Sequence, residues 1–482
     1  MKVKSLKHNF IMFFLRNFFT LGFTIFIFPI VVKKLGPENL GKIQYVEAIV
    51  AYFLLFINLG IDTYGKREVA LYREDREKLS SIVLELIFIL LITTIIGIII
   101  YLINIKYLMD DIIIKKISMI YLLNIIFNFI GVEWFYIGIE NQEYITKRNL
   151  FFKFLSAISI LLFINSKNDM YIYVFIVIFS LVGSNLLNIL NLKKYIVLKK
   201  IKIKDISKHL KPLFVLFFSV LSASIAHHLD SIMVKNIVGV KELGYYSFAM
   251  KFGKIPIVLT TTIVAVLYPR LCNLLGQNKK KEYYQLATIG IEIILLFSTP
   301  ITIGMFLISD IIVKVFAGTD FLNSIPVMKV FSILILVMGI AYSTGSITLV
   351  ANKRDKVYSL SVVLGALLNF IFNLLYIPKI GALGAAIATI ITEVIAIIVR
   401  ILFCMDIFKK IKISIFNLVK IIISSTFMGI VVYYIKNFSS NLTINLIFSI
   451  IFGGIAYSIS LLLFKEKYII NFLEKLKNKF KE

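Results

Sequence analysis

Apolar side chains fall in long runs along the whole chain, and short polar segments separate one run from the next. A helix of about 20 apolar residues is long enough to cross the roughly 30 Å hydrocarbon core of a bilayer. The runs therefore predict an all-α polytopic membrane protein with about 14 transmembrane helices. We place these helices near residues 10–32, 43–64, 81–104, 117–138, 149–165, 170–191, 212–235, 245–268, 284–307, 327–350, 358–377, 382–404, 414–435 and 443–464.

The composition agrees with this pattern and excludes several classes of protein. Hydrophobic residues make up 59% of the 482 residues, and the mean hydropathy is +0.91, which is far from the balance of a soluble enzyme. The formal net charge is +26, but the lysines and arginines lie between the apolar runs, which argues against a nucleic-acid-binding surface. With two cysteines and four histidines, neither a disulfide framework nor a metal site is expected.

The distribution of positive charge predicts the orientation of the chain. If the N-terminus is cytoplasmic, the inside segments carry roughly 34 lysines and arginines and the outside segments about 12. Both termini are then cytoplasmic. The segments between the runs are short, so we expect no extramembrane domain that could hold soluble chemistry.

A short repeat suggests how the helices are organised. Residues 35–41 (LGPENLG) match residues 238–244 (VGVKELG) when the sequence is displaced by about 203 positions. Six predicted helices separate the two copies, which indicates a parallel duplication. We therefore predict four parts: an N-terminal six-helix lobe at 1–203, a C-terminal six-helix lobe at 204–411, two extra helices at 412–464 and a cytoplasmic amphipathic basic tail at 465–482.

Four cations lie at or within the predicted depth of the membrane. They are Arg16, Lys153, Lys251 and Lys254. A charged side chain facing lipid costs about 2.5–3.5 kcal/mol, so we expect such groups to line a hydrated cavity between the lobes. A cationic cavity suits an anionic substrate, above all a phosphate or diphosphate. For the lysines, an alternative is that each extends its amine to the membrane interface.

Several carboxylates also fall within or near the runs. Glu47, Asp62 and Asp230 either pair with the cations or bind a coupling proton or sodium ion, and the sequence leaves both interpretations open. A further set of charged residues lies nearer the helix ends, where we expect anchoring at the interface: Glu85, Glu292, Glu393, Arg400 and Lys420. No motif typical of ATP hydrolysis, metallohydrolases or serine hydrolases is present, so no catalytic residue is expected.

Specific segments resemble those of a known family. They are residues 41–45 (GKIQY), 59–70 (LGIDTYGKREVA), 133–140 (EWFYIGIE), 144–149 (YITKRN), 230–234 (DSIMV), 244–246 (GYY) and 267–271 (LYPRL). Together they resemble Wzx-type flippases of lipid-linked oligosaccharides, which belong to the multidrug, oligosaccharidyl-lipid and polysaccharide (MOP) exporter superfamily. The resemblance spans the first twelve predicted helices in order. It implies a MATE-like fold with two six-helix lobes around a central cavity.

The resemblance also implies a function. A Wzx-type flippase moves an undecaprenyl-diphosphate-linked oligosaccharide repeat unit from the cytoplasmic to the outer leaflet of the bacterial plasma membrane, for O-antigen or capsule biosynthesis. The expected partners are that lipid-linked glycan, membrane lipids and the polymerase and chain-length machinery of polysaccharide assembly, with no nucleic acid and no cofactor apart from a coupling H⁺ or Na⁺. Two alternatives remain: an ion-coupled multidrug exporter of the same superfamily, and a membrane-embedded glycan polymerase or transferase.

Overall fold

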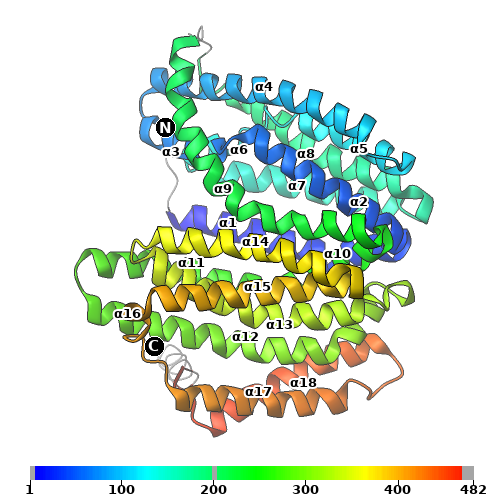
Figure 1. Cartoon of the computed structure of the whole chain (residues 1–482), viewed down its shortest axis with the longest axis vertical. Coiled ribbons are helices and arrows are strands. Elements are labelled where there is room, and N and C mark those ends of the chain that lie inside the picture. The colour runs from blue at the N-terminus through cyan, green and yellow to red at the C-terminus, as the bar shows by residue number, and fades with distance from the viewer. Residues whose placement is uncertain (1–5, 198–202, 469, 471–482) are drawn as a thin grey trace. The chain divides into compact units, whose positions relative to one another are not determined.

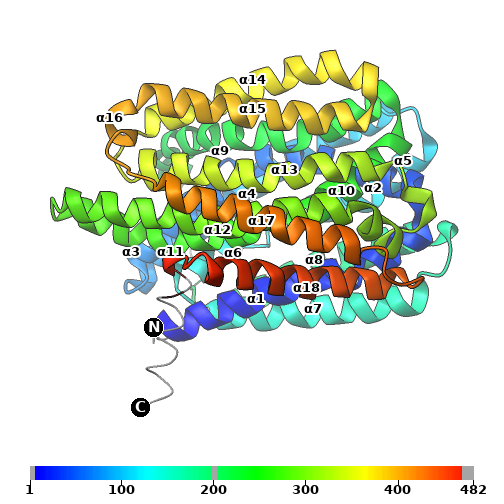
Figure 2. The same cartoon turned by 90° about the horizontal axis from the view of Figure 1, so that it is seen from below.

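The computed structural model describes residues 6–197, 203–468 and 470, apart from a few side chains, mainly at 218–220 and 222–227. Helices occupy every predicted apolar run, and the described residues contain no strand, so the all-α prediction is confirmed. Most of the predicted basic tail at 465–482 lies outside the described residues. The long helices of each unit lie side by side (Figures 1 and 2).

The chain divides into two compact units, residues 1–244 and 245–482, and we describe each by itself. The first unit holds α1 (Leu6–Phe26), α2 (Phe28–Asn58), α3 (Ile61–Tyr72), α4 (Arg76–Tyr107), α5 (Ile112–Ile126), α6 (Glu133–Gly138), α7 (Gln142–Phe163), α8 (Met170–Leu192) and α9 (Ile203–Val238). α1 packs on α7, α2 packs on α4 and α5, and α3 packs on α6. α9, which we predicted as the first helix of the C-terminal lobe, packs on α2, α3 and α4.

The division falls within α10 (Val240–Lys254), and the second unit continues from it. This unit holds α11 (Ile257–Gly276), α12 (Lys280–Phe316), α13 (Ser324–Tyr342), a π-helical stretch (Ser343–Val350), α14 (Asp355–Ile380), α15 (Ala382–Phe403), α16 (Met405–Phe408), α17 (Ile415–Ile435) and α18 (Leu442–Leu463). α17 and α18 pack on each other and on α12. Glu292 of α12, which accepts the backbone N–H of Ser414 at 2.8 Å and the hydroxyl of Tyr468, contributes to this attachment.

Ten of the described helices are long and apolar enough to cross a membrane, and a shorter apolar stretch covers Ile11–Phe26. This establishes a multi-pass membrane protein, while the predicted count of about 14 is not confirmed. Four predicted runs are interrupted internally. The run at 10–32 is interrupted at Ile27, and the run at 43–64 is interrupted at Leu59 and Gly60. The run at 117–138 breaks between α5 and α6, and the run at 245–268 breaks at Pro256, where α11 begins.

The two copies of the predicted repeat meet inside the first unit. Gly36 and Gly239, at equivalent positions, both have positive φ, 76° and 102°. A Cβ added to Gly41 would lie 1.8 Å from the carbonyl oxygen of Val240. A Cβ added to Gly244 would lie 1.9 Å from the carbonyl oxygen of Pro37. The contact is therefore reciprocal, and it requires glycine on both sides because the two backbones touch.

Candidate functional site

The polar part of the first unit is organised around the break between α5 and α6. The break leaves backbone carbonyls without helical partners, and asparagine amides satisfy them: Asn185 donates to the carbonyl of Phe127 at 3.2 Å, and Asn188 donates to that of Gly131. Asn128 donates to the side chain of Asn58 at 2.7 Å. Irregular backbone inside a membrane protein needs such internal partners. The asparagines thus fix the point at which α6 starts.

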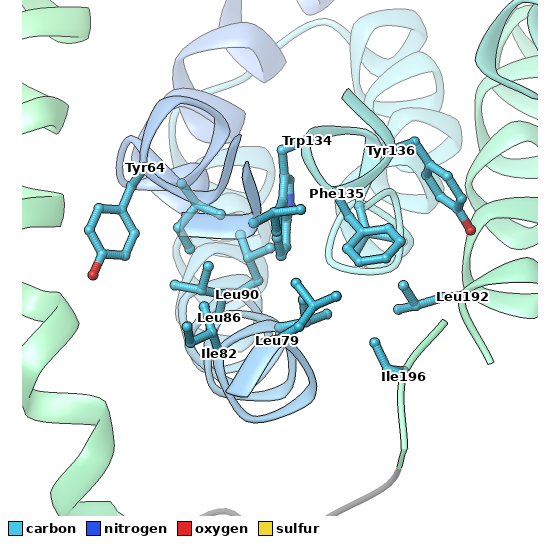
Figure 3. Close-up of a cluster of buried hydrophobic side chains, with 14 of the residues drawn as sticks. Tyr64, Leu79, Ile82, Leu86, Leu90, Trp134, Phe135, Tyr136, Leu192 and Ile196 are labelled. Carbon is cyan, nitrogen blue, oxygen red and sulfur yellow. The ribbon is translucent and has the colours of Figure 1, made fainter. Parts of the chain in front are cut away.

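α6 starts with Glu133, and the three aromatic residues that follow hold it in place. Trp134, Phe135 and Tyr136 are buried in a hydrophobic cluster with side chains of α3, α4 and α8 (Figure 3). The Tyr136 hydroxyl donates to the carbonyl of Asn188 at 2.6 Å. With these side chains fixed, α6 cannot rotate. Glu133 is therefore held in one direction.

Glu133 joins two arginines from different helices. Its Oε1 accepts from Arg16 of α1 at 2.9 Å, and its Oε2 accepts from Arg148 of α7 at 2.8 Å. The Arg148 side chain is 3% exposed, whereas the Glu133 side chain is 38% exposed, so the pair is buried at one end and open at the other. Arg148 also donates to Asn149 at 2.8 Å, and its Nε is buried without a hydrogen-bond partner.

Lys153 brings a third cation to this place. It lies one to two turns beyond Arg148 on α7, and its amine is 5.4 Å from the centre of the Phe23 ring. It also interacts electrostatically with the positive charge of Arg16. We call Arg16, Glu133, Arg148 and Lys153 the α1–α6–α7 charge cluster. It contains three cations and one carboxylate, so it keeps an excess of positive charge. Such a cluster can bind an anion by charge-assisted hydrogen bonds, and arginine is well suited to phosphate oxygens.

The structure thus brings together two of the four predicted cations. Arg16 and Lys153 meet in the charge cluster, although Arg16 has a carboxylate partner that its own helix did not reveal. Lys251 and Lys254 lie in the last turn of α10, in the second unit, where both are partly buried. Whether all four line one cavity stays a prediction.

The three predicted carboxylates lie in three different environments. Asp62 of α3 interacts electrostatically with Lys66 and with Glu133, so it borders the charge cluster. Glu47 of α2 accepts a hydrogen bond from the Tyr121 hydroxyl of α5 at 3.0 Å. Asp230 of α9 is buried at 4% exposure and interacts electrostatically with Tyr52. Their role in ion coupling stays a prediction.

Three of the residues expected at the interface are buried within the protein. Glu85, Glu292 and Arg400 are 4%, 4% and 5% exposed. Arg400 donates to the hydroxyl of Ser361 at 2.8 Å and to the carbonyl of Ala341 at 3.0 Å, beneath the ring of Tyr358. Neighbouring side chains therefore cover these three residues, and the anchoring expected for them at the membrane interface stays a prediction.

Sequence reasoning missed Glu133 and Arg148 as members of a site. Both stood in segments that were noted for their resemblance, but Glu133 pairs with Arg16 across 117 residues of sequence and with Arg148 across 15 residues. The available signal was the charge itself: Glu133 is the only ionised residue within the predicted run 117–138. A carboxylate in an apolar run is expected to pair with a cation, and Arg16 was a cation with no carboxylate in its own predicted helix.

Comparison with known proteins agrees with this architecture. Residues 6–275 match the family described as polysaccharide biosynthesis protein, and residues 216–375 match the MatE family. A putative O-antigen transporter of Escherichia coli strain K12 is 22% identical over 381 residues, which cover 78% of this chain and 91% of that protein.

Two solved structures share the fold. One is described as the lipid II flippase MurJ in an inward closed conformation, with a TM-score of 0.76, 19% identity and coverage of 96% of this chain and 100% of that one. Another is an inward-facing multidrug resistance MATE family transporter of the MOP superfamily, with a TM-score of 0.62, 15% identity and coverage of 79% and 93%. The MATE-like fold and the resemblance to Wzx-type flippases are confirmed. The chain belongs to the polysaccharide biosynthesis protein family of membrane transporters.

Proposed function

We propose that this protein is a flippase that moves an undecaprenyl-diphosphate-linked oligosaccharide repeat unit from the cytoplasmic to the outer leaflet of a bacterial plasma membrane. The observation that carries the proposal is the α1–α6–α7 charge cluster, in which two arginines share a single carboxylate and Lys153 adds a third cation. The names of the similar proteins, an O-antigen transporter and a lipid II flippase, support a lipid-linked glycan as the substrate class.

The chemistry of the cluster fits the problem that such a substrate poses. A diphosphate cannot cross hydrocarbon unaided because an ion without water or partners there costs tens of kcal/mol in the idealised limit. Arg16, Arg148 and Lys153 would replace the water around the diphosphate oxygens, while the polyprenyl chain stays in lipid. Glu133 would keep the arginines paired when no substrate is bound. Alternating access of two lobes would then carry the headgroup across.

The proposal includes the setting of the protein. Both termini face the cytoplasm, transport is driven by H⁺ or Na⁺, and the product passes to the polymerase and chain-length machinery of surface polysaccharide assembly. The relatives are transporters by name, which favours transport over glycan polymerisation. The MatE match over residues 216–375 keeps one alternative, export of drugs coupled to an ion.

The test is flipping in proteoliposomes that contain an undecaprenyl-diphosphate glycan with a fluorescent label. The wild type should move the label to the leaflet where a membrane-impermeant quencher reaches it. The double variant Arg16→Gln/Arg148→Gln should lower the initial rate by about 10²-fold or more, since each lost charge-assisted hydrogen bond is worth roughly 1.5–3 kcal/mol.

The matched control is Lys106→Gln, which removes an exposed cation from the last turn of α4, away from the charge cluster. This variant should flip at the wild-type rate. An unchanged rate in the double arginine variant would remove the cluster from the mechanism. Movement of cationic dyes without movement of the lipid-linked glycan would favour the drug exporter.

A further inference from the structure

A chain of three buried titratable groups lies where the first part of α9 meets α3 and α4. The hydroxyl of Tyr64 on α3 is 2.7 Å from Nδ1 of His209 on α9. Nε2 of His209 is 2.7 Å from Oε2 of Glu85 on α4. The three residues are 5%, 2% and 4% exposed. The histidine is thus held between two partners and shielded from solvent.

The other charged groups around these three hydrogen-bonded residues come from α3 and α9. Lys208, the neighbour of His209, places its amine 3.0 Å from Oε2 of Glu85, and its side chain is 52% exposed. On α3, Arg67 lies over the ring of Tyr64 at 5.1 Å and pairs with Glu68. Glu68 and Tyr72 interact electrostatically with Tyr64. On α4, Glu85 is the group that faces His209.

The remaining surface that holds this part of α9 is apolar and close-packed. Phe56 of α2 contacts Phe217 of α9, with ring centres 5.3 Å apart. A Cβ added to Gly60, between α2 and α3, would lie 2.9 Å from the backbone nitrogen of Phe217. In Figure 3, the Tyr64 ring points away from Trp134 and Leu86, which leaves its hydroxyl free to reach α9. The hydrogen-bonded chain is therefore the polar part of an otherwise apolar contact.

His209 can take up a proton here without losing either hydrogen bond. As neutral imidazole it accepts the Tyr64 hydroxyl proton at Nδ1 and donates from Nε2 to Glu85. When a proton binds Nδ1, that nitrogen becomes a donor and the Tyr64 hydroxyl turns to accept. The imidazolium then faces the Glu85 carboxylate, so the attraction of opposite charges is added to a hydrogen bond that the carboxylate already strengthens.

We propose that Tyr64, His209 and Glu85 form a proton-binding site in which proton uptake by His209 tightens the docking of α9 on α3 and α4. As a coupling site for transport it rests on the proposed function, because it would supply the H⁺ that a flippase could use. As a proton-binding site it stands apart from that function. Histidine suits the role because its charge changes between about pH 5 and pH 8.

The test is hydrogen–deuterium exchange of the full-length protein in lipid nanodiscs, followed in peptides that cover residues 205–217. Protection factors, corrected for the intrinsic pH dependence of exchange, are compared from about pH 5.5 to pH 8. In the wild type, protection should be highest at the acidic end and should fall by at least about threefold toward the alkaline end.

Two variants make the result specific. His209→Gln keeps a donor and an acceptor but does not titrate, so the pH dependence should disappear while the helix still docks. His8→Gln removes another histidine of the same unit, whose Nε2 lies 3.0 Å from Glu143, and should leave the transition of α9 unchanged. A flat profile in the wild type, an opposite slope, or the same slope in His209→Gln would overturn the proposal.

Flipping driven by a pH gradient separates this proposal from the proposed function. If the exchange transition depends on His209 but no lipid-linked glycan is flipped, the proton site stands and the transport function fails. If the glycan is flipped and His209→Gln shows the wild-type exchange profile, the function stands and the proton site fails.

Discussion

Glu133 is shared by two arginines, and one of them, Arg148, is almost completely buried. A buried guanidinium that loses its carboxylate keeps the full cost of its lost hydration. The carboxylate therefore has a structural role in the absence of substrate. It also competes with any anion that approaches the arginines. The Glu133 side chain therefore affects both the stability of the empty site and the affinity of the site for an anion.

Glu133→Gln should separate these two effects. We expect the variant to lose about 1–3 kcal/mol of stability, seen as a lower midpoint of thermal unfolding in detergent, because the arginines lose a charged acceptor. Inorganic diphosphate should raise that midpoint more in the variant than in the wild type, because it no longer competes with Glu133. Asp406→Asn, which removes a 58% exposed carboxylate paired with the 36% exposed Arg354, should leave the unfolding midpoint close to that of the wild type. Equal responses to diphosphate in variant and wild type would contradict this account.

At this scale the sequence predicted Arg16 and Lys153 and missed their partners. A lone cation in an apolar run can be recognised from the sequence, because the free-energy cost of placing a charge in the membrane follows from the sequence of that run alone. Its partner is not visible in the same way, because Glu133 reaches Arg16 only after α6 has been placed by the asparagines that satisfy the break and by the aromatic residues in the core. For the same reason, Glu85 and His209 could not be joined across 124 residues of sequence.

At the scale of elements, hydropathy located the helices and failed at their interruptions. The run at 117–138 is apolar throughout, yet the chain leaves the helix between Ile126 and Glu133. Hydropathy does not show which group donates a hydrogen bond to a backbone carbonyl. In this break, the donors are side-chain amides of asparagine rather than backbone N–H groups of a helix. The break at Pro256 was the more predictable of the two, because proline lacks the N–H that a continuous helix needs and often begins a new helix.

The reciprocal glycine contact gives a prediction about elements. Gly41→Ala places a Cβ 1.8 Å from the Val240 carbonyl oxygen, so α2 and α10 must separate. We expect a loss of at least about 1–3 kcal/mol, the usual range for overpacking, measured as a lower unfolding midpoint and a lower yield of monodisperse protein. Gly244→Ala should have a similar effect.

The control for this prediction is Gly454→Ala on α18, where an added Cβ meets no atom within 4 Å. Alanine there should be neutral or should stabilise the helix by roughly 0.5–1 kcal/mol. If Gly41→Ala and Gly454→Ala unfold at the same temperature, the backbone contact between the two repeat copies is not needed for the folded state.

At the scale of the whole molecule, the sequence predicted a polytopic helical membrane protein because apolar length and charge asymmetry depend on the bilayer rather than on tertiary contacts. The lobe limits are less accessible to such reasoning. The repeat places a boundary after residue 203, whereas the compact units of the structure meet at Gly244, and α9 packs with the helices that precede it. Which helices move together in transport is set by packing, and the predicted lobes remain a hypothesis about that motion.

The orientation of the molecule provides the last prediction. Glu74, in the turn between α3 and α4, belongs to a segment rich in lysine and arginine, and Asn168 lies in the exposed turn between α7 and α8, which carries little positive charge. Positively charged segments stay in the cytoplasm, so the two turns should lie on opposite sides of the membrane. With Cys272 and Cys404 replaced by alanine, a membrane-impermeant maleimide should label Asn168→Cys in intact cells and Glu74→Cys after permeabilisation. The reverse pattern would invert the direction of transport proposed here, because the charge cluster would then load substrate from the other leaflet.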